Sequence, residues 1–368
     1  MTRRAPMTLL ANMKRRRAED AETEGRSWRA ALALAVRAPE ELAAAVALDT
    51  AAGAALTSEG AVEAARRFPV RVPREVTARV RRGDAADPLL RQFAPSAEET
   101  AMVAGFSRDP LGEAAAAAVP GLLHKYRGRV LLVVTGACPV HCRYCFRRHF
   151  PYGDHALGAE ALAAALEYVR ADRSIHEVIL SGGDPLSLGD DALAALEARL
   201  AAIPHLRRLR VHTRWPIMVP SRVGEPLLDW LRRSRLRPVV VVHSNHAAEI
   251  DGEVGAALAR LRDGGVSLLN QSVLLRGVND SVDALCELSE TLHDAGVLPY
   301  YLHLLDPVEG TAHFAVGARE ARHLLREVAA RLPGYLVPRL AREESGGAAK
   351  TVLAPARPRR GSRAAVPQ

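Results

Sequence analysis

Six short runs of β-branched and aliphatic residues constrain the fold of this chain most strongly. They are RVLLVVT (129–135), EVILSGG (177–183), LRVHT (209–213), PVVVVHS (238–244), VSLLNQS (266–272) and LPYYLHLLD (298–306). Helical stretches such as DDALAALEARLAAI lie between them, and strands that alternate with helices predict a parallel sheet. Six units are fewer than the eight of a closed barrel. We therefore expect an α/β fold, a partial (β/α)6 TIM-like barrel with its functional residues at the carboxyl ends of the strands.

The rest of the chain divides into four further regions around this predicted barrel. Residues 25–120 are rich in alanine and carry apolar residues at three- and four-residue steps, which predicts a helical accessory region. We expect the barrel itself over 121–310 and a C-terminal segment over 311–353. Basic tails are predicted at 1–24 and 354–368.

The formal charge of +8 is concentrated at the two ends of the chain. Residues 1–17 contain six basic and no acidic side chains, and residues 351–368 contain four basic and no acidic ones. Because these ten charges exceed the total of +8, the remaining residues carry about two net negative charges. A nucleic-acid partner is therefore not expected for the body of the protein, and we interpret the tails as solvated chain ends.

Cysteine usage and hydropathy predict a cytoplasmic protein. The chain has four cysteines, three of them within eight positions, which is too few and too clustered for a disulfide framework. No N-terminal apolar run precedes a cleavage site, and no stretch approaches the length of a membrane span. Thiols stay reduced in the cytoplasm, where clustered cysteines more often bind metal or perform chemistry.

The clustered cysteines Cys138, Cys142 and Cys145 follow directly on the first predicted strand. They therefore belong to a loop at the edge of the barrel where active sites of such folds lie. Three thiolates can hold three irons of a 4Fe–4S cluster and leave the fourth iron open to a ligand from outside the protein. A structural zinc site is the alternative, with His141 or His149 as its fourth ligand.

The C-x3-C-x2-C pattern, with Tyr144 before its last cysteine, resembles the radical S-adenosylmethionine superfamily, in which the open iron binds that cofactor. SGGDPL (181–186), at the end of the second predicted strand, resembles the glycine-rich segment that receives the cofactor's methionine amino group. Glycine permits such a close approach because it has no side chain. The resemblance assigns the S-adenosylmethionine site to Ser181, Gly182, Gly183 and Asp184.

Further motifs resemble the lysine 2,3-aminomutase family, over roughly residues 25–353. They are KYRGRVLLVV, CRYCFRRHFPY, HTRWPIMVPSR, LLNQSVLLRGVND, PYYLHLLDPVEGTAHF and GYLVPRLAREESGGAAK. The resemblance is closest to the short bacterial branch that makes (R)-β-lysine for the modification of elongation factor P. It implies an isomerase that converts L-α-lysine to β-lysine with a 4Fe–4S cluster, S-adenosylmethionine and pyridoxal 5′-phosphate. The implied partners are the elongation factor P ligase and a flavodoxin or ferredoxin that donates electrons.

The resemblance also implies which residues bind the cofactors. In SGGAAK, small residues let the backbone approach a phosphate while the lysine amine reacts with an aldehyde, so Lys350 matches the residue that binds pyridoxal phosphate. Arg129 and Arg214 match cations near the phosphate or ring of that cofactor, and arginine suits phosphate because it can donate two parallel hydrogen bonds. His243 and Gln271 align with polar residues around S-adenosylmethionine.

Three residues match the family's substrate contacts. Arg147 matches the position that binds the substrate carboxylate, and Asp306 matches an acid that meets the side-chain ammonium of lysine. Lysine-degrading members have a second aspartate seven residues before the cofactor lysine, where this chain has Glu343. We expect Glu343 to be the second contact to the ammonium, and the longer side chain favours the elongation-factor branch.

Two other functions stay open at this point. A related radical aminomutase, acting in lysine catabolism or on glutamate, would share both cofactors, but a glutamate side chain calls for a cation where Asp306 and Glu343 stand. A non-catalytic iron–sulfur or zinc module that binds RNA through the tails would not take pyridoxal phosphate.

Overall fold

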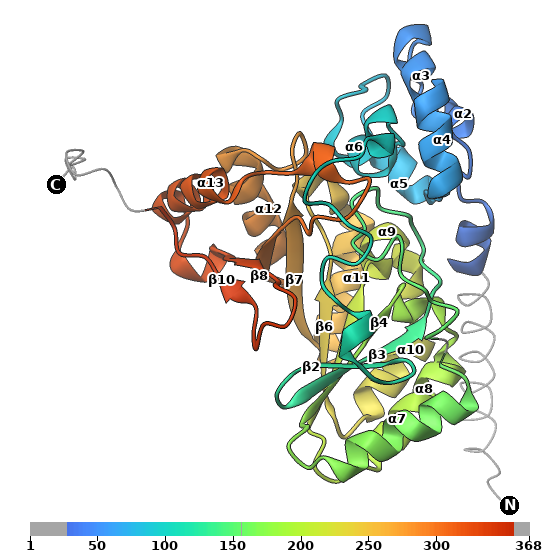
Figure 1. The fold of residues 1–368 in the computed structure, drawn as a ribbon, viewed down its shortest axis with the longest axis vertical. Helices are drawn as coiled ribbons and strands as arrows, with labels where there is room; N and C mark the ends of the chain where they lie inside the picture. Colours follow the sequence, from blue (N-terminus) through green and yellow to red (C-terminus); the bar gives the residue numbers. More distant parts are fainter. Residues whose placement is uncertain (1–27, 156, 357–368) are drawn as a thin grey trace, which may run out of the picture.

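A single ten-stranded sheet organises the protein, whose computed structural model describes residues 28–155 and 157–356 (Figure 1). The strands lie side by side in chain order from β1 to β10, so the sheet is open at both edges. Their bounds are β1 Ala117–Val119, β2 Leu122–Tyr126, β3 Arg129–Thr135, β4 Glu177–Gly182, β5 Arg208–Thr213, β6 Arg237–Val242, β7 Ser267–Leu274, β8 Leu298–Leu304, β9 Arg339–Arg342 and β10 Thr351–Val352.

The six predicted strands are β3 to β8, and they pair in parallel. This confirms the prediction of an open, mostly parallel α/β sheet. One further parallel strand, β9, pairs with β8 and was not predicted, because RLAR is short and half of it is arginine. Antiparallel strands complete the edges, with β1 and β2 beside β3 and with β10 beside β9.

The sequence of each strand reflects what covers it. All six residues of β4 are buried, which is typical of a central parallel strand that is covered on both faces. In β7, buried residues alternate with partly exposed ones, because successive side chains of a strand point to opposite faces. Gln271 belongs to the partly exposed set and lines the cavity described below.

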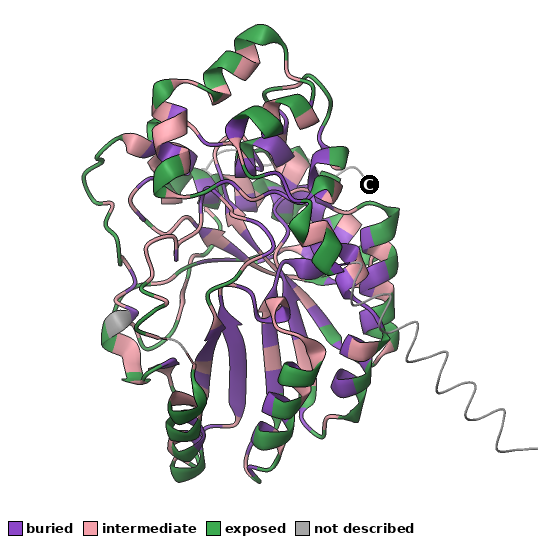
Figure 2. Cartoon of the chain, turned by 90° about the vertical axis from the view of Figure 1, so that its right-hand side faces the viewer, coloured by how far each residue is buried: buried purple, intermediate pink, exposed green. Residues whose placement is uncertain are grey.

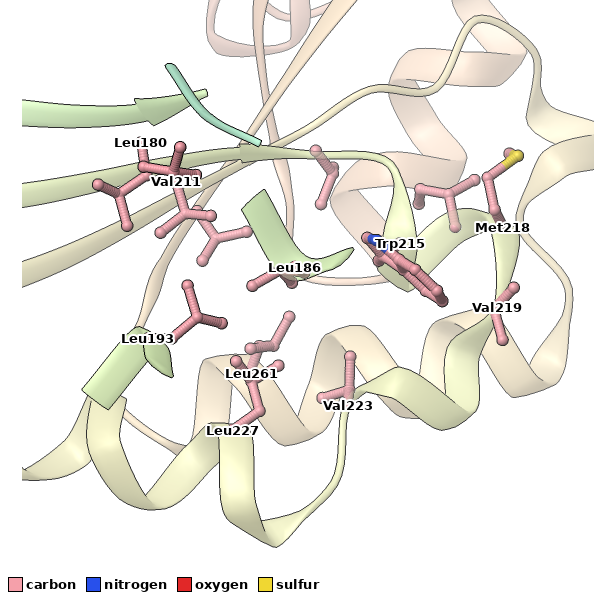
Figure 3. Close-up of a cluster of buried hydrophobic side chains, with 14 of the residues drawn as sticks. Leu180, Leu186, Leu193, Val211, Trp215, Met218, Val219, Val223, Leu227 and Leu261 are labelled. Atoms are coloured by element: carbon pink, nitrogen blue, oxygen red, sulfur yellow. The ribbon is translucent and has the colours of Figure 1, made fainter. Parts of the chain in front are cut away.

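Helices connect the successive parallel strands, and Figure 2 shows buried strands with helices beside them whose outer sides are exposed. The helices are α7 Ala159–Ala171, α8 Asp190–Ala201, α9 Trp215–Met218, α10 Glu225–Arg233, α11 Gly252–Asp263, α12 Val282–Asp294 and α13 Ala318–Arg331. Figure 3 shows one part of the core, where apolar side chains of β4 and β5 meet those of α8, α10 and α11. Trp215 is fully buried there, and its ring packs edge to face on Trp28, with 5.1 Å between ring centroids. Since Trp28 comes from the first described residues, the N-terminal segment shares this core.

Short helices precede the sheet and lie at one end of it in Figure 1: α2 Pro39–Ala45, α3 Thr50–Leu56, α4 Glu59–Arg67, α5 Arg74–Arg79 and α6 Pro88–Phe93. The fully buried Arg143 connects them to the cysteine loop, since it donates hydrogen bonds to Glu99 (Nη2 to Oε2, 2.6 Å) and to the carbonyl oxygen of Phe68 (2.6 Å). The region boundaries stay predictions, although β1 already begins before residue 120. The predicted tail 1–24, and all but residues 354–356 of the tail 354–368, lie outside the described residues.

Within the described ranges, no helix is long and apolar enough to span a membrane.

Candidate active site

One cavity of about 360 Å³ opens at the carboxyl ends of the parallel strands. Every residue to which the sequence analysis assigned a role in the site lines it. These residues are Arg129, Cys138, Cys142, Cys145, Arg147, Ser181, Gly182, Gly183, Asp184, Arg214, His243, Gln271, Asp306, Glu343 and Lys350. Most of them share this position because the carboxyl ends of neighbouring parallel strands meet at one edge, whereas Arg129 lines the cavity from the start of β3. Their individual roles stay predictions.

The loop after β3 carries the three cysteines, all of which are free thiols. Burial raises the pKa of the Cys138 thiol well above its usual value and that of Cys145 to about 11. A bound metal reverses this preference, because a cation stabilises the thiolate. In the described part of the chain, no three Cys, His, Asp or Glu side chains converge as the ligands of a single metal ion. Three thiols along one wall of a cavity are a donor set that fits three corners of a 4Fe–4S cluster.

The two histidines of the alternative zinc site make other contacts. His141 Nδ1 lies 2.8 Å from the carbonyl oxygen of Pro69, and its ring stacks on Phe68. His149 Nε2 lies 3.2 Å from the carbonyl oxygen of Glu309. The structure therefore offers no support for either histidine as the fourth ligand of a zinc site.

Gly182 and Gly183, at the end of β4, are required because the backbone of the cysteine loop lies directly against them. A Cβ atom on Gly182, whose φ is +121°, would lie 2.4 Å from the carbonyl oxygen of Thr135. A Cβ atom on Gly183 would lie 2.4 Å from the carbonyl oxygen of Ala137. These glycines let the end of β4 lie directly against the cysteine loop, a steric requirement that exists before any cofactor binds. Their predicted contact with S-adenosylmethionine stays a prediction.

Asp184 is buried and holds the ends of two strands together. Its carboxylate accepts hydrogen bonds from Thr213 Oγ1 (2.8 Å), from the backbone N–H of Arg214 (2.6 Å) and from that of Leu186 (3.1 Å). Burial raises the pKa of Asp184 to about 7 even though these donors oppose the shift. Since both oxygens are engaged within the chain, the structure favours a positioning role for Asp184 over the predicted cofactor contact.

Arg214 lies at the cysteine end of the cavity. Its Nη1 donates to Cys142 Sγ (2.8 Å) and to Tyr144 Oη (2.5 Å), and its Nη2 donates to Glu249 Oε2 (2.6 Å). Arg214 and Glu249 are both buried. The predicted contact of Arg214 with pyridoxal phosphate stays a prediction, and in the structure its guanidinium is engaged by the cysteine loop and by a buried carboxylate.

Lys350 lies at the other end of the cavity, where charges alternate along a chain of ion pairs. Lys350 Nζ lies 2.6 Å from Glu343 Oε2, and Glu343 Oε1 lies 2.9 Å from Lys125 Nζ. Lys125 Nζ also lies 3.3 Å from Glu113 Oε1, and Glu113 binds Arg147 through both oxygens, at 2.7 and 2.8 Å. Burial opposes the ionisation of Glu343, but Lys350 and Lys125 outweigh it and lower the pKa of Glu343 to about 2.

Glu113 is the site residue that the sequence analysis missed. Its carboxylate is buried and occupies two of the five N–H donors of Arg147, while Arg147 Nη1 donates to Ser181 Oγ (3.0 Å) and to the carbonyl oxygen of Gly182 (3.2 Å). Arg147 therefore retains a single free N–H for the predicted substrate carboxylate. Glu113 lies in a turn inside the predicted helical region 25–120, and no motif of the sequence analysis contains it.

Asp306 differs from the other acids of the cavity because it has no hydrogen-bond or ion-pair partner among the described side chains. Burial raises its pKa to about 7, Glu343 and Glu113 add to the shift, and Lys350 opposes it. A carboxylate in such a place gains strongly from a cationic ligand. Arg129, at the start of β3, instead places its guanidinium 4.6 Å from the ring centre of Tyr126, so its predicted contact with phosphate stays a prediction.

Neutral histidines form the inner wall of the cavity. Burial lowers the pKa values of His243 and His303 to about 3 and that of His212 well below its usual value. Gln271 Nε2 lies 2.7 Å from His243 Nε2, and His212 Nε2 is buried with no hydrogen-bond partner in the described structure. The predicted S-adenosylmethionine residues His243 and Gln271 thus belong to a polar but uncharged surface.

Comparisons with known proteins identify the class of protein that has this fold and site. Residues 132–241 match the model of the Radical SAM superfamily. The chain is 51% identical over 290 residues to L-lysine 2,3-aminomutase of Escherichia coli, and this match covers 79% of this chain and 84% of that protein. It is 46% identical over 296 residues to L-lysine 2,3-aminomutase of Haemophilus influenzae (80% and 88% covered), and 37% identical over 274 residues to that of Clostridium subterminale (74% and 65% covered).

The match to the superfamily model gives residues 132–241 the character of a radical SAM protein. The identity to these relatives shows that the chain belongs to the L-lysine 2,3-aminomutase family.

Proposed function

We propose that this protein is an L-lysine 2,3-aminomutase, an isomerase that converts L-α-lysine to β-lysine. The observation that carries the proposal is a single cavity lined by three thiols, by Lys350 and by the unpaired carboxylate of Asp306. Such a carboxylate attracts an ammonium group, which the side chain of lysine has and that of glutamate lacks. The names of the curated relatives support the same activity.

The donor sets of the cavity fit the three groups that this family uses. The thiols of Cys138, Cys142 and Cys145 would hold the 4Fe–4S cluster, and the amine of Lys350 would bind pyridoxal phosphate. When bound, the cluster and S-adenosylmethionine supply the radical chemistry, and pyridoxal phosphate carries the nitrogen that moves. The protein's own contribution is to orient these groups and the substrate around one small cavity. Arg147 offers its remaining N–H to the substrate carboxylate, and Asp306 binds the ammonium at the far end.

We also propose that the product is (R)-β-lysine for the modification of elongation factor P. Support comes from Glu343, which stands where lysine-degrading members have aspartate, and from the identities of 51% and 46% to the relatives from E. coli and H. influenzae, against 37% to that from C. subterminale. The elongation factor P ligase would then take the product, and a flavodoxin or ferredoxin would supply electrons.

Anaerobic turnover of the reconstituted protein tests the activity. The protein is incubated with L-lysine, S-adenosylmethionine, pyridoxal phosphate and a reductant, and α- and β-lysine are separated by chiral chromatography. We expect β-lysine that disappears when any one addition is left out, with the R enantiomer in excess. Formation of 5′-deoxyadenosine while lysine stays unchanged would overturn the assigned substrate, and L-glutamate tested in parallel would identify the related aminomutase.

A further inference from the structure

We propose that Glu343 is a positioning residue that holds the amine of Lys350, and that Asp306 alone binds the side-chain ammonium of the substrate. This inference rests on the proposed function, and it revises the expectation that Glu343 is a second contact to the substrate. Three observations carry it: the register of the C-terminal hairpin, the partners of Glu343 and the isolation of Asp306.

The hairpin formed by β9 and β10 brings Glu343 and Lys350 together. The two strands pair antiparallel, with Thr351 opposite Arg342 and Val352 opposite Ala341. Extended by one residue toward the turn, this register puts Lys350 opposite Glu343, just beyond the last paired residues of the two strands. Side chains of directly opposite residues lie close enough to interact. Backbone pairing therefore sets this contact, and it exists before any ligand enters the cavity.

Both carboxylate oxygens of Glu343 already have a cationic partner from the chain. Its Oε2 contacts Lys350 Nζ at 2.6 Å, and its Oε1 contacts Lys125 Nζ at 2.9 Å. The side chains of Glu343 and Lys125 are 15% and 17% exposed, so little water replaces either contact when it breaks. A substrate ammonium would have to displace one of two cations that the chain itself supplies. Breaking a mostly buried ion pair is unfavourable because it leaves one charge uncompensated.

Asp306 is in the opposite situation. It follows β8, next to the hairpin on the sheet, and it lines the same cavity without an ion pair or a hydrogen bond to its carboxylate in the described ranges. An ammonium group that enters the cavity therefore compensates a lone carboxylate at Asp306, whereas at Glu343 it would compete with Lys350 and Lys125. The two acids have the same functional group and opposite surroundings, and the surroundings decide their roles.

Binding of pyridoxal phosphate separates the two roles without turnover. Protein freed of the cofactor is titrated with limiting pyridoxal phosphate and reduced with borohydride, and the fraction of the peptide containing residue 350 that carries the cofactor is measured by mass spectrometry. For Glu343→Gln we expect this fraction to fall about tenfold, the effect of losing one charged hydrogen bond. With saturating cofactor, KM for lysine should stay within about twofold of wild type, since an unaffected contact leaves substrate binding unchanged.

Asp306→Asn should show the opposite pattern, with normal attachment of the cofactor and a KM for lysine raised about tenfold or more. Glu343→Ala serves where the glutamine variant does not fold, because it also removes the carboxylate that contacts Lys350 and should lower attachment as well. The control is Glu320→Gln, which removes a bidentate pair with Arg276 on the surface, at 2.7 Å for both contacts, and should change neither quantity.

Unchanged attachment in both Glu343 variants, or a tenfold rise of KM in Glu343→Gln at saturating cofactor, would overturn the inference. The attachment measurement needs no turnover, so it tests the contact between Glu343 and Lys350 even if the wild-type protein does not convert lysine. A wild-type protein that leaves lysine unchanged would reject the proposed function, but it would not reject the positioning role of Glu343.

Discussion

The two ends of the cavity are built in different ways. At the cysteine end, the side chains of Arg214 and Glu249 are 7% and 1% exposed, and both are engaged with other residues of the chain. At the other end, the side chain of Lys350 is 24% exposed, and Asp306 has no partner in the described structure. The closed end suits a group that stays in place through many turnovers, such as a cluster. The open end suits ligands that must enter, react and leave.

Removing one cluster ligand should have the largest effect, because it breaks the closed end. We expect Cys142→Ala to lose both the bound iron and β-lysine formation, since the two remaining thiols can bind only two of the cluster's irons. Iron content of the protein before pyridoxal phosphate is added measures the loss, together with turnover. The control is Cys286→Ala, because Cys286 lies in α12, in a separate core cluster. An unchanged iron signal in Cys142→Ala would reject the cluster assignment.

Breaking the open end alone should separate cofactor chemistry from cluster chemistry. In Lys350→Ala we expect full iron content and no β-lysine, because the amine that binds pyridoxal phosphate is lost while the cysteine loop is untouched. Iron analysis and chiral chromatography on one preparation give both results. Normal turnover by this variant would remove Lys350 from its assigned role.

Glu113 contacts residues at both ends of the cavity, and its replacement should lower the stability of the protein. Glu113→Gln leaves the buried Arg147 without its bidentate carboxylate, so we expect the free energy of unfolding to fall by about 3 kcal/mol. Urea unfolding of the cofactor-free protein measures the change. The exposed pair of Glu320 and Arg276 is the matched comparison, and Glu320→Gln should change stability by less than about 0.5 kcal/mol. Equal effects of the two substitutions would show that Glu113 is not a structural counter-ion.

The smallest expected effect is a gain in stability, where the preceding substitution should cause a loss. The pKa of Asp306 is raised to about 7, so the folded protein binds a proton that the unfolded chain releases near pH 4, and stability falls as pH rises between these values. Asp306→Asn should therefore stabilise the empty protein at pH 8, by about 1 kcal/mol because the carboxylate borders a cavity open to water. The gain should vanish near pH 4, and thermal unfolding across this range measures it. Destabilisation at pH 8 would mean that Asp306 has a partner in the empty site.

Much of the site could be predicted because its residues lie in short motifs. Cys138, Cys142 and Cys145 share one loop, and the loop follows a strand that the run RVLLVVT predicts on its own. The missed features depend on contacts between distant segments. Glu113 reaches Arg147 from 34 positions away, and Lys125 reaches Glu343 across 218 positions. No local pattern encodes such a distance.

Arg214 shows that a motif can predict the position of a residue without predicting the partners of its side chain. Its motif predicts a residue at the carboxyl end of β5, which is where it lies, but the partner is decided by what packs on that end. Glu249 comes from the loop after β6, and Tyr144 comes from the cysteine loop. Strand β9 was missed for a related reason, since a run of four residues becomes a strand only when β8 lies beside it.

The sequence by itself determined the alternation of strands and helices, the three thiols after the first parallel strand, and a lysine in the C-terminal segment, because hydrophobic periodicity and residue spacing are local properties. The tertiary structure decided which charges meet. The electrostatic partner of a side chain depends on burial and on distances across the fold, and these exist only once the sheet has brought its carboxyl ends together. Glu343 and Asp306 both carry a carboxyl group, and only the folded chain engages one of them and leaves the other open to a ligand.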